Sequence, residues 1–298
     1  MRLELASFEA KDGLNLRGLL FLPKAKTKRA ILYLHGLGGN FYSSSIEQMA
    51  KEACSKNIAF LAIQQRGSHI ADELEYANGG SLLAGSAFEN FEESEYDIYG
   101  SLSFLKKKGF SEIVIVSKST GCQKAIYFLY KNKGKKIAKI KGLLLLSPVD
   151  DRNYDIENHK RNGKDFYSNI VLAKKLEKND KNAIMPKELL PEDQWPISAS
   201  RFLSVAEEKR VEGKLLDYAR DLKEFKSIEI PIIAVFGSED KFMINEKNIH
   251  KAAERLKENK HTRKVVILNG ANHSLEKNGK FPSKFVIKLA SELFNLKK

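Results

Sequence analysis

The sequence has little cysteine and no long apolar run. Only two cysteines, Cys54 and Cys122, occur among its 298 residues, too few for a disulfide framework, which predicts a reducing compartment. Both lie on apolar stripes with helical spacing, so we expect buried side chains rather than reactive thiols. No apolar segment approaches the roughly 18 residues of a membrane span, and the first residues mix acids among apolar side chains, unlike a signal peptide. These absences predict a cytoplasmic protein without a membrane span.

Acidic side chains are in deficit, with 38 Asp and Glu against 51 Lys and Arg, for a net charge of +13. Residues 151–229 are neutral, with 16 basic and 16 acidic side chains, so the excess belongs to the rest of the chain. Basic runs at residues 24–29, 106–108, 131–141 and 257–264 each lead into a predicted strand. We expect them at the amino-terminal edge of a sheet, where they favour solubility and complement helix dipoles. No nucleic-acid partner is expected, and docking to an acidic surface is the alternative.

Short apolar runs alternate with helical patterns from residue 29 onward, which predicts an α/β fold. The runs are apolar throughout, as in parallel strands that helices cover on both faces. The predicted strands are residues 30–34, 58–63, 113–116, 143–146, 232–236 and 265–268. The main predicted helices are residues 45–57, 91–108, 120–133, 245–259 and 282–297. Before them, residues 3–10 and 15–23 flank an Asp-Gly pair that favours a hairpin turn.

One interval interrupts this alternation. Residues 147–231 lie between two predicted strands, far more than the ~10–20 residues that one crossover helix requires. The interval holds the only tryptophan, Trp195, two nearby prolines, Pro191 and Pro196, and several amphipathic stretches. It predicts an inserted cap over roughly residues 151–225; the alternative is a solvated excursion without function.

The strand predicted at residues 113–116 runs into Ser117-Lys118-Ser119-Thr120-Gly121. A strand, a sharp turn and a helix form a nucleophile elbow, which lifts a serine hydroxyl off the edge of the sheet. Ser119 is the predicted nucleophile; an ordinary helix N-cap is the alternative for Ser119, and Ser117 is a weaker candidate nucleophile. Ser117 also stands where the usual Gly-x-Ser-x-Gly pattern has its first glycine. Lys118 adds a cation that either points into solvent or favours an anionic substrate.

Other strand ends carry suitable partners, and such ends meet at one edge of a parallel sheet. Residues 35–40 form a glycine-rich loop whose backbone N–H groups can approach a substrate oxygen. Asp240 and His273 follow two later strands, which gives serine, acid and histidine in chain order. Alternatives to Asp240 are Glu239, Asp150 and Asp151. The competitors of His273 are His35, expected to brace the glycine-rich loop, His69, a candidate pocket residue, and the surface candidates His159, His250 and His261.

This constellation resembles the α/β-hydrolase superfamily, whose triad has that order on those strand ends. The resemblance implies a mostly parallel eight-stranded sheet flanked by helices, with a core of residues 1–150 and 226–298 and a helical cap at 151–225 after the sixth strand. It also implies that Ser119 attacks a carbonyl, that His273 transfers the proton and that Asp240 orients the imidazole. The backbone N–H groups of Leu37 and Thr120 would form the oxyanion hole.

A closer likeness comes from shorter motifs: Ser119-Thr120-Gly121-Cys122-Gln123, residues 35–40, Arg66-Gly67 and residues 85–92. Together they are similar to a branch of α/β-hydrolases related to fungal siderophore esterases. The resemblance implies a serine carboxylesterase that acts on a small or medium ester without a metal or organic cofactor. The alternatives are an amide, thioester or carbon–carbon bond hydrolase with the same triad, and a non-catalytic ligand-binding protein of this fold.

Overall fold

The computed structural model describes residues 1–135 and 137–296. Its main sheet has eight strands in the order β1-β2-β4-β3-β7-β8-β9-β10. The strands are β1 (Arg2–Glu9), β2 (Asn15–Leu22), β3 (Arg29–Leu34), β4 (Ala59–Ile63), β7 (Glu112–Lys118), β8 (Ile140–Leu146), β9 (Ile232–Gly237) and β10 (Thr262–Leu268). The β1–β2 and β2–β4 pairs are antiparallel, and the remaining pairs are parallel. The predicted mostly parallel, eight-stranded α/β sheet is confirmed.

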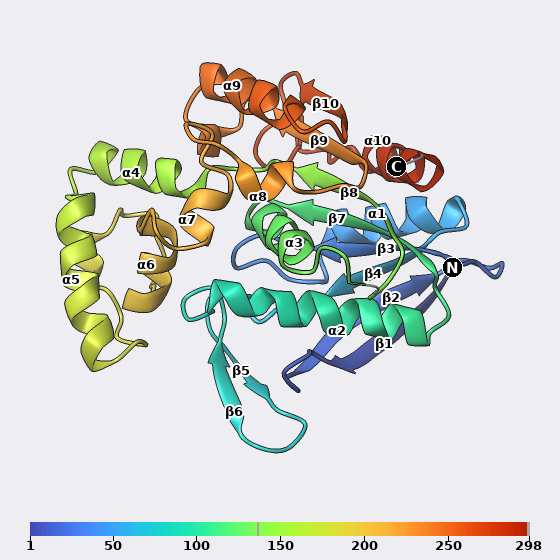
Figure 1. Cartoon of the computed structure of the whole chain (residues 1–298), viewed down its shortest axis with the longest axis horizontal. Helices are drawn as coiled ribbons and strands as arrows, with labels where there is room; N and C mark the ends of the chain where they lie inside the picture. The colour runs from blue at the N-terminus through green and yellow to red at the C-terminus, as the bar shows by residue number, and fades with distance from the viewer. Residues whose placement is uncertain (136, 297–298) are drawn as a thin grey trace.

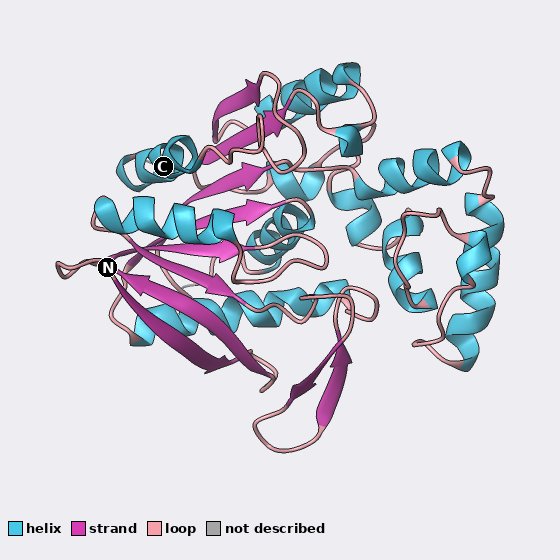
Figure 2. Cartoon of the chain, turned by 180° about the vertical axis from the view of Figure 1, so that it is seen from behind, coloured by secondary structure: helices cyan, strands magenta, loops and turns pink. Residues whose placement is uncertain are grey.

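Helices cover both faces of this sheet (Figures 1 and 2). One face packs against α1 (Ser44–Ser55) and α10 (Ser283–Asn295). The other face packs against α2 (Ser94–Lys107), α3 (Thr120–Lys131), α8 (Lys223–Lys226) and α9 (Glu246–Lys257). Successive residues of a central strand alternate between the two cores; Ile113 and Ile115 face one, Val114 and Val116 the other. This double coverage explains why the central strands are apolar throughout.

The observed helices end within a few residues of the predicted ones, and part of the last prediction, at residues 297–298, lies outside the described residues. The predicted helix at residues 91–108 divides into the 3₁₀ turn η1 (Phe91–Glu93) and α2. A separate antiparallel hairpin of β5 (Asp72–Glu75) and β6 (Ser81–Ala84) was not predicted. Its strands have only four residues each, and their sequences, Asp-Glu-Leu-Glu and Ser-Leu-Leu-Ala, are too short to show a clear alternating pattern.

Between β8 and β9 the chain forms α4 (Asp151–Arg161), α5 (Phe166–Asn179), the 3₁₀ turn η2 (Lys187–Leu189), α6 (Ala199–Ala206), α7 (Glu212–Leu215) and α8. In Figures 1 and 2, α4, α5 and α6 form a lobe beyond the carboxyl ends of the central strands. The lobe has a hydrophobic cluster of its own, which includes Phe166 and Phe202. Leu215 to Phe225 contribute instead to the main core, against α3.

The structure corrects the expectation that His159 lies on the surface. Its ring is fully buried rather than on the surface, because it packs inside the lobe between the rings of Phe166 and Phe202, with centroids 5.1 and 5.9 Å away. The described parts of the basic runs precede β3, β7, β8 and β10, at the amino-terminal edge of the sheet; Lys136 lies outside the described residues. Among the described residues, none of the helices combines the length and apolar character needed to cross a membrane.

Candidate active site

Ser119 lies at the turn between β7 and α3. Its backbone has φ 53° and ψ −130°, a conformation that costs a non-glycine residue on the order of 1–3 kcal/mol and is typical of functional turns. Its side chain makes no capping hydrogen bond to α3. The Ser119 hydroxyl therefore does not act as the N-cap of α3, which was the alternative to a nucleophile.

Two glycines allow the chain to approach this turn closely. A Cβ atom on Gly36 would lie 2.8 Å from the Cβ of Ser119, so only glycine leaves room for the side chain of Ser119 beside β3. A Cβ atom on Gly121 would lie 2.6 Å from the carbonyl oxygen of His35, because the first turn of α3 packs directly against the end of β3. These contacts give the physical reason for glycine at both positions.

Ser117 fits the elbow in place of the usual glycine. Its side chain is fully buried, and its Oγ donates a 3.4 Å hydrogen bond to the carbonyl oxygen of Leu144 on the neighbouring strand β8. The small hydroxymethyl group is therefore accommodated between strands, and it lies in the sheet rather than at the turn. This position also separates Ser117 from the hydrogen-bonded chain that contains Ser119.

The structure brings Ser119, His273 and Asp240 together. The hydroxyl of Ser119 lies 3.0 Å from Nε2 of His273, and Nδ1 of His273 lies 2.8 Å from a carboxylate oxygen of Asp240. Asp240 is buried, and its other oxygen accepts a 3.0 Å hydrogen bond from the backbone N–H of Phe242. Glu239 is exposed and does not reach the histidine. This chain of hydrogen bonds has the geometry that activates a serine hydroxyl.

The other acid candidates lie elsewhere. Asp150 caps α4 by accepting a 3.0 Å hydrogen bond from the backbone N–H of Asn153. Asp151 accepts a 3.0 Å hydrogen bond from the hydroxyl of Thr120, so it lies beside the turn at Ser119 without contacting Nδ1 of His273. Neither carboxyl group is placed to orient the imidazole of His273.

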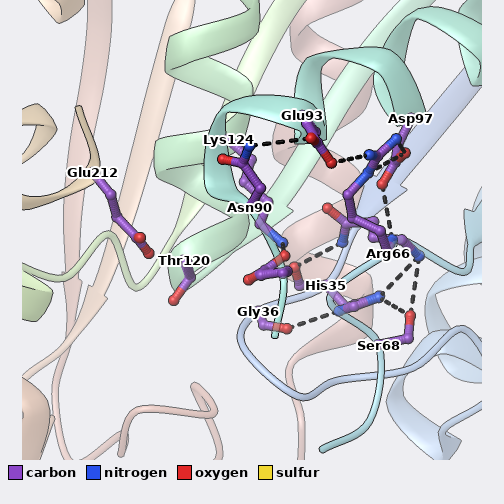
Figure 3. Close-up of polar contacts among 12 residues, drawn as sticks. His35, Gly36, Arg66, Ser68, Asn90, Glu93, Asp97, Thr120, Lys124 and Glu212 are labelled. Atoms are coloured by element: carbon purple, nitrogen blue, oxygen red, sulfur yellow. Dashed lines mark hydrogen bonds and ion pairs between the residues drawn. The ribbon is translucent and has the colours of Figure 1, made fainter. Parts of the chain in front are cut away.

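His35 braces the glycine-rich loop, as expected. Its Nδ1–H donates to the carbonyl oxygen of Gly36 at 2.7 Å, and its Nε2 lies 2.8 Å from the hydroxyl of Ser68 (Figure 3). Burial lowers the pKa of His35 to about 4, so the ring is neutral at pH 7. His69 hydrogen-bonds to the hydroxyl of Tyr42 at 2.8 Å and is absent from the cavity lining, whereas His250 lies exposed on α9.

The two backbone N–H groups predicted for the oxyanion hole flank Ser119. Thr120 is the first residue of α3, where N–H groups have no acceptor within the helix. Leu37 follows Gly36 in the loop after β3, and its N–H makes no backbone hydrogen bond within the described residues. Both residues line the cavity that contains Ser119. Two free N–H donors beside a nucleophile suit a negatively charged oxygen.

Lys118 does not extend freely into solvent. Burial lowers the pKa of Lys118, while the charges of Glu276 and Asp240 act in the opposite direction. Its ammonium donates a 3.3 Å hydrogen bond to the hydroxyl of Ser274. The cation therefore lies on the His273 side of the cavity, near two carboxylates.

Ser119 and His273 open into a cavity of about 390 Å³. One wall comes from the sheet edge and the loop after β3, and the other comes from α4, α6 and the segment before α6. The second wall contains Asp155 and Arg201, which no sequence pattern marked as functional, and Trp195, which the sequence placed in the predicted cap but not in the site. The available signal was Asp151 and Asp155 spaced one helical turn apart, which places both on one helix face.

Larger hollows of about 820 and 670 Å³ lie at the amino-terminal edge of the sheet, and they contain neither Ser119 nor His273.

Within residues 1–135 and 137–296, no group of three or more His, Cys, Asp or Glu side chains is arranged to hold a metal ion.

The strand order and the helices on both faces of the sheet place the protein in the structural class of the α/β-hydrolase fold. Within that class, the chain belongs to the DUF1749 family, whose model, described as "Protein of unknown function (DUF1749)", matches residues 84–292. A search among curated proteins finds no match.

Solved structures with the same fold include several esterases. Est1E from Butyrivibrio proteoclasticus, in a structure with bound ferulic acid, is 16% identical with a TM-score of 0.64, and the match covers 98% of this chain and 100% of that one. The siderophore hydrolase EstB from Aspergillus fumigatus is 16% identical with a TM-score of 0.70, covering 99% and 97%. The esterase Pf2001 from Pyrococcus furiosus is 15% identical with a TM-score of 0.55, covering 99% and 89%. At these identities the likeness establishes the fold.

Proposed function

We propose that this protein is a serine hydrolase that cleaves carboxylic esters through an acyl-enzyme. The observation that carries the proposal is the hydrogen-bonded chain from the hydroxyl of Ser119 through His273 to Asp240, with distances of 3.0 and 2.8 Å. An ester substrate is supported by solved structures with the same fold, which include the siderophore hydrolase EstB and the esterase Pf2001.

In the proposed reaction, Oγ of Ser119 attacks the ester carbonyl carbon and passes its proton to Nε2 of His273. Asp240 stabilises the resulting imidazolium through Nδ1, and the N–H groups of Leu37 and Thr120 bind the tetrahedral oxyanion, each contributing about 3 kcal/mol. The C–O bond then breaks, the alkoxide takes the proton from His273, and an acyl-Ser119 remains. Water attacks the acyl group with His273 as base, which releases the acid and restores Ser119.

We also propose that residues 151–225 act as a cap that shapes the substrate cavity. Support comes from the cavity lining, which includes Asp151, Tyr154, Trp195 and Val205 from this segment. The lobe of α4 to α6 lies beyond the carboxyl ends of the strands, where Ser119 is. Such a position suits a segment that selects substrates and limits water access.

The test combines a fluorophosphonate probe with a series of nitrophenyl esters of increasing acyl length. We expect a covalent adduct on Ser119, and Ser119→Ala is expected to lower kcat/KM by about 10⁴-fold or more. Ser55→Ala, an exposed serine at the end of α1, is the matched control and is expected to retain the wild-type rate.

Labelling at another serine, or ester hydrolysis that persists in Ser119→Ala, would contradict the proposal. Thioester and amide substrates in the same panel identify the preferred bond. Faster turnover of either class than of esters would assign the same residues to the alternative reaction.

A further inference from the structure

Carboxyl groups line the cap side of the cavity. Asp151 and Asp155 come from one face of α4, and Asp193 comes from the segment before α6. We call these three residues the cavity carboxylates. No ion pair within the described residues includes any of them. Carboxyl groups without a basic partner are therefore concentrated on the cap wall of the cavity that contains Ser119.

The two basic side chains that line the same cavity, Arg201 and Lys118, interact with other acidic residues. The two terminal nitrogens of Arg201 bind both carboxylate oxygens of Glu212, at 2.5 and 2.8 Å, and Glu89 lies 3.6 Å from the guanidinium. Lys118 lies on the opposite side, near Glu276 and Asp240. Neither cation forms an ion pair with a cavity carboxylate. Asp193 is exposed to water, whereas Asp151 and Asp155 are partly buried, so the counter-charge of these two must come from a proton or from a ligand.

Asp155 is the least satisfied of the three. Asp151 accepts a hydrogen bond from Thr120 at 3.0 Å, and Asp193 accepts one from Asn158 at 3.1 Å. Within the described part of the chain, no donor reaches the carboxyl group of Asp155, although the side chain is partly buried at the cavity wall. A carboxyl group enclosed in this way lacks the partner that folded proteins usually supply.

Aromatic rings surround the same space. The ring of Tyr154 lies 4.6 Å from that of Phe242, which lies 4.3 Å from the imidazole of His273. Trp195 closes the other side, because a Cβ atom on Gly38 would lie 3.3 Å from its ring. The faces of such rings attract cations. Rings and an unpartnered carboxyl group therefore occur together in one cavity.

We propose that Asp155, with the rings of Tyr154 and Trp195, forms a subsite for an ammonium group carried by the ester substrate. The inference rests on the proposed ester hydrolysis at Ser119 and names its substrate class, an ester with a quaternary or protonated amine within reach of the scissile bond. The ammonium supplies the missing counter-charge of Asp155 and lies against the aromatic faces.

The titration of Asp155 supports this assignment. Burial, followed by the charges of Asp151, Glu212 and Asp193, raises the pKa of Asp155 to about 8, while Arg201 acts in the opposite direction. A bound ammonium favours the charged carboxylate, so its binding near neutral pH releases a proton. Preference for a cationic substrate therefore increases as the pH rises through about 8.

The experiment compares esters that differ only in charge. On the alcohol side, butyrylcholine is paired with its neutral isostere, in which carbon replaces nitrogen; on the acyl side, the nitrophenyl ester of γ-butyrobetaine is paired in the same way. The readout is the ratio of kcat/KM for the charged ester to kcat/KM for the neutral one. We expect a ratio of about 10 or more for at least one pair in the wild-type protein, and the pair that responds identifies the side that carries the amine.

Asp155→Asn is expected to bring this ratio close to 1 and to remove its increase between about pH 6.5 and 9. Asp180→Asn, an exposed acid on the same lobe, is the matched control and is expected to keep the wild-type ratio. Trp195→Leu is a second variant that lowers the ratio without changing any carboxyl group.

A wild-type ratio near 1 for both pairs, or a high ratio that survives in both Asp155→Asn and Trp195→Leu, overturns the subsite. If the wild-type protein cleaves the neutral esters without a charge preference, the subsite fails while the proposed function stands. If it cleaves none of the four esters and Ser119 is not labelled, the proposed function fails, and the subsite with it.

Discussion

Two groups of charged side chains meet near α6 and differ in how their charges are balanced. The buried quartet, Glu89, Lys124, Arg201 and Glu212, contains two acids and two bases, none more than 4% exposed. Lys124 lies 2.6 Å from Glu89, and Arg201 binds Glu212 with two hydrogen bonds. The cavity carboxylates have no basic partner. A balanced buried group fits a structural role, whereas an unbalanced group in the cavity of Ser119 fits the binding of a ligand.

The quartet also connects separate parts of the chain. Lys124 lies in α3, about one turn after Ser119, whereas Arg201 and Glu212 lie in α6 and α7. Glu89 bridges them from the loop before η1, because its carboxylate lies near both Lys124 and Arg201. Figure 3 shows that Lys124 and Glu212 come from two different elements, α3 and α7. The quartet therefore holds the lobe segment against the helix that positions Ser119.

The largest expected effect comes from breaking the quartet. Lys124→Met leaves Glu89 without its closest counter-charge in a buried site, which is expected to lower the free energy of unfolding by about 3–5 kcal/mol. Urea unfolding measures this change. Arg210→Met, which removes a partly exposed partner of Glu177 and Glu207, is the control and is expected to cost less than about 1 kcal/mol. Equal losses in both variants would remove the distinction between buried and exposed pairs.

Asp155→Asn, unlike Lys124→Met, is expected to raise the free energy of unfolding. The pKa of Asp155 is raised to about 8 in the folded protein, against about 4 when unfolded, so the folded state holds more protons between these values. Wild-type stability therefore falls as the pH rises from about 4 to 8 because of this group. The variant lacks that loss, so its advantage should grow as the pH rises to about 8. A pKa difference of about 4 corresponds to about 5 kcal/mol, and because water still reaches the partly exposed carboxyl group, we expect an advantage on the order of 2 kcal/mol.

Urea unfolding of Asp155→Asn at about pH 5, 7 and 9 checks this prediction. Asp180→Asn is expected to show no pH-dependent difference from the wild-type protein. An advantage of Asp155→Asn that is constant with pH would mean that ionisation of the Asp155 carboxyl group is not its cause.

The smallest effect concerns Asp151, the cavity carboxylate with a hydroxyl partner. Thr120→Val keeps the backbone N–H and the shape of the side chain but removes the 3.0 Å hydrogen bond to Asp151. We expect a loss of about 1 kcal/mol in the free energy of unfolding. Thr120→Ser, which keeps the hydroxyl, is expected to lose less. If the two variants are equally stable, the hydroxyl contributes nothing to the junction between α3 and α4.

Residues near the ends of strands could be predicted from the sequence because their position follows from local pattern. The apolar run before Ser119, and the loops that contain Asp240 and His273, each mark the carboxyl end of a buried strand, and parallel strands bring such ends to one edge. His159 shows the limit of this reasoning. Its burial depends on Phe166 and Phe202, which come from other helices, and no short-range pattern links the three residues.

The sequence by itself determined the α/β sheet, the elbow at Ser119 and the serine, acid and histidine order, because period, turn chemistry and chain order are local properties. Only the tertiary structure decided which charges are balanced. Glu89 and Lys124 are 35 positions apart, and Arg201 reaches them from another segment. Electrostatic energy depends on distances in space and on burial, so the pairing of these residues and the isolation of Asp155 appear only in the folded chain.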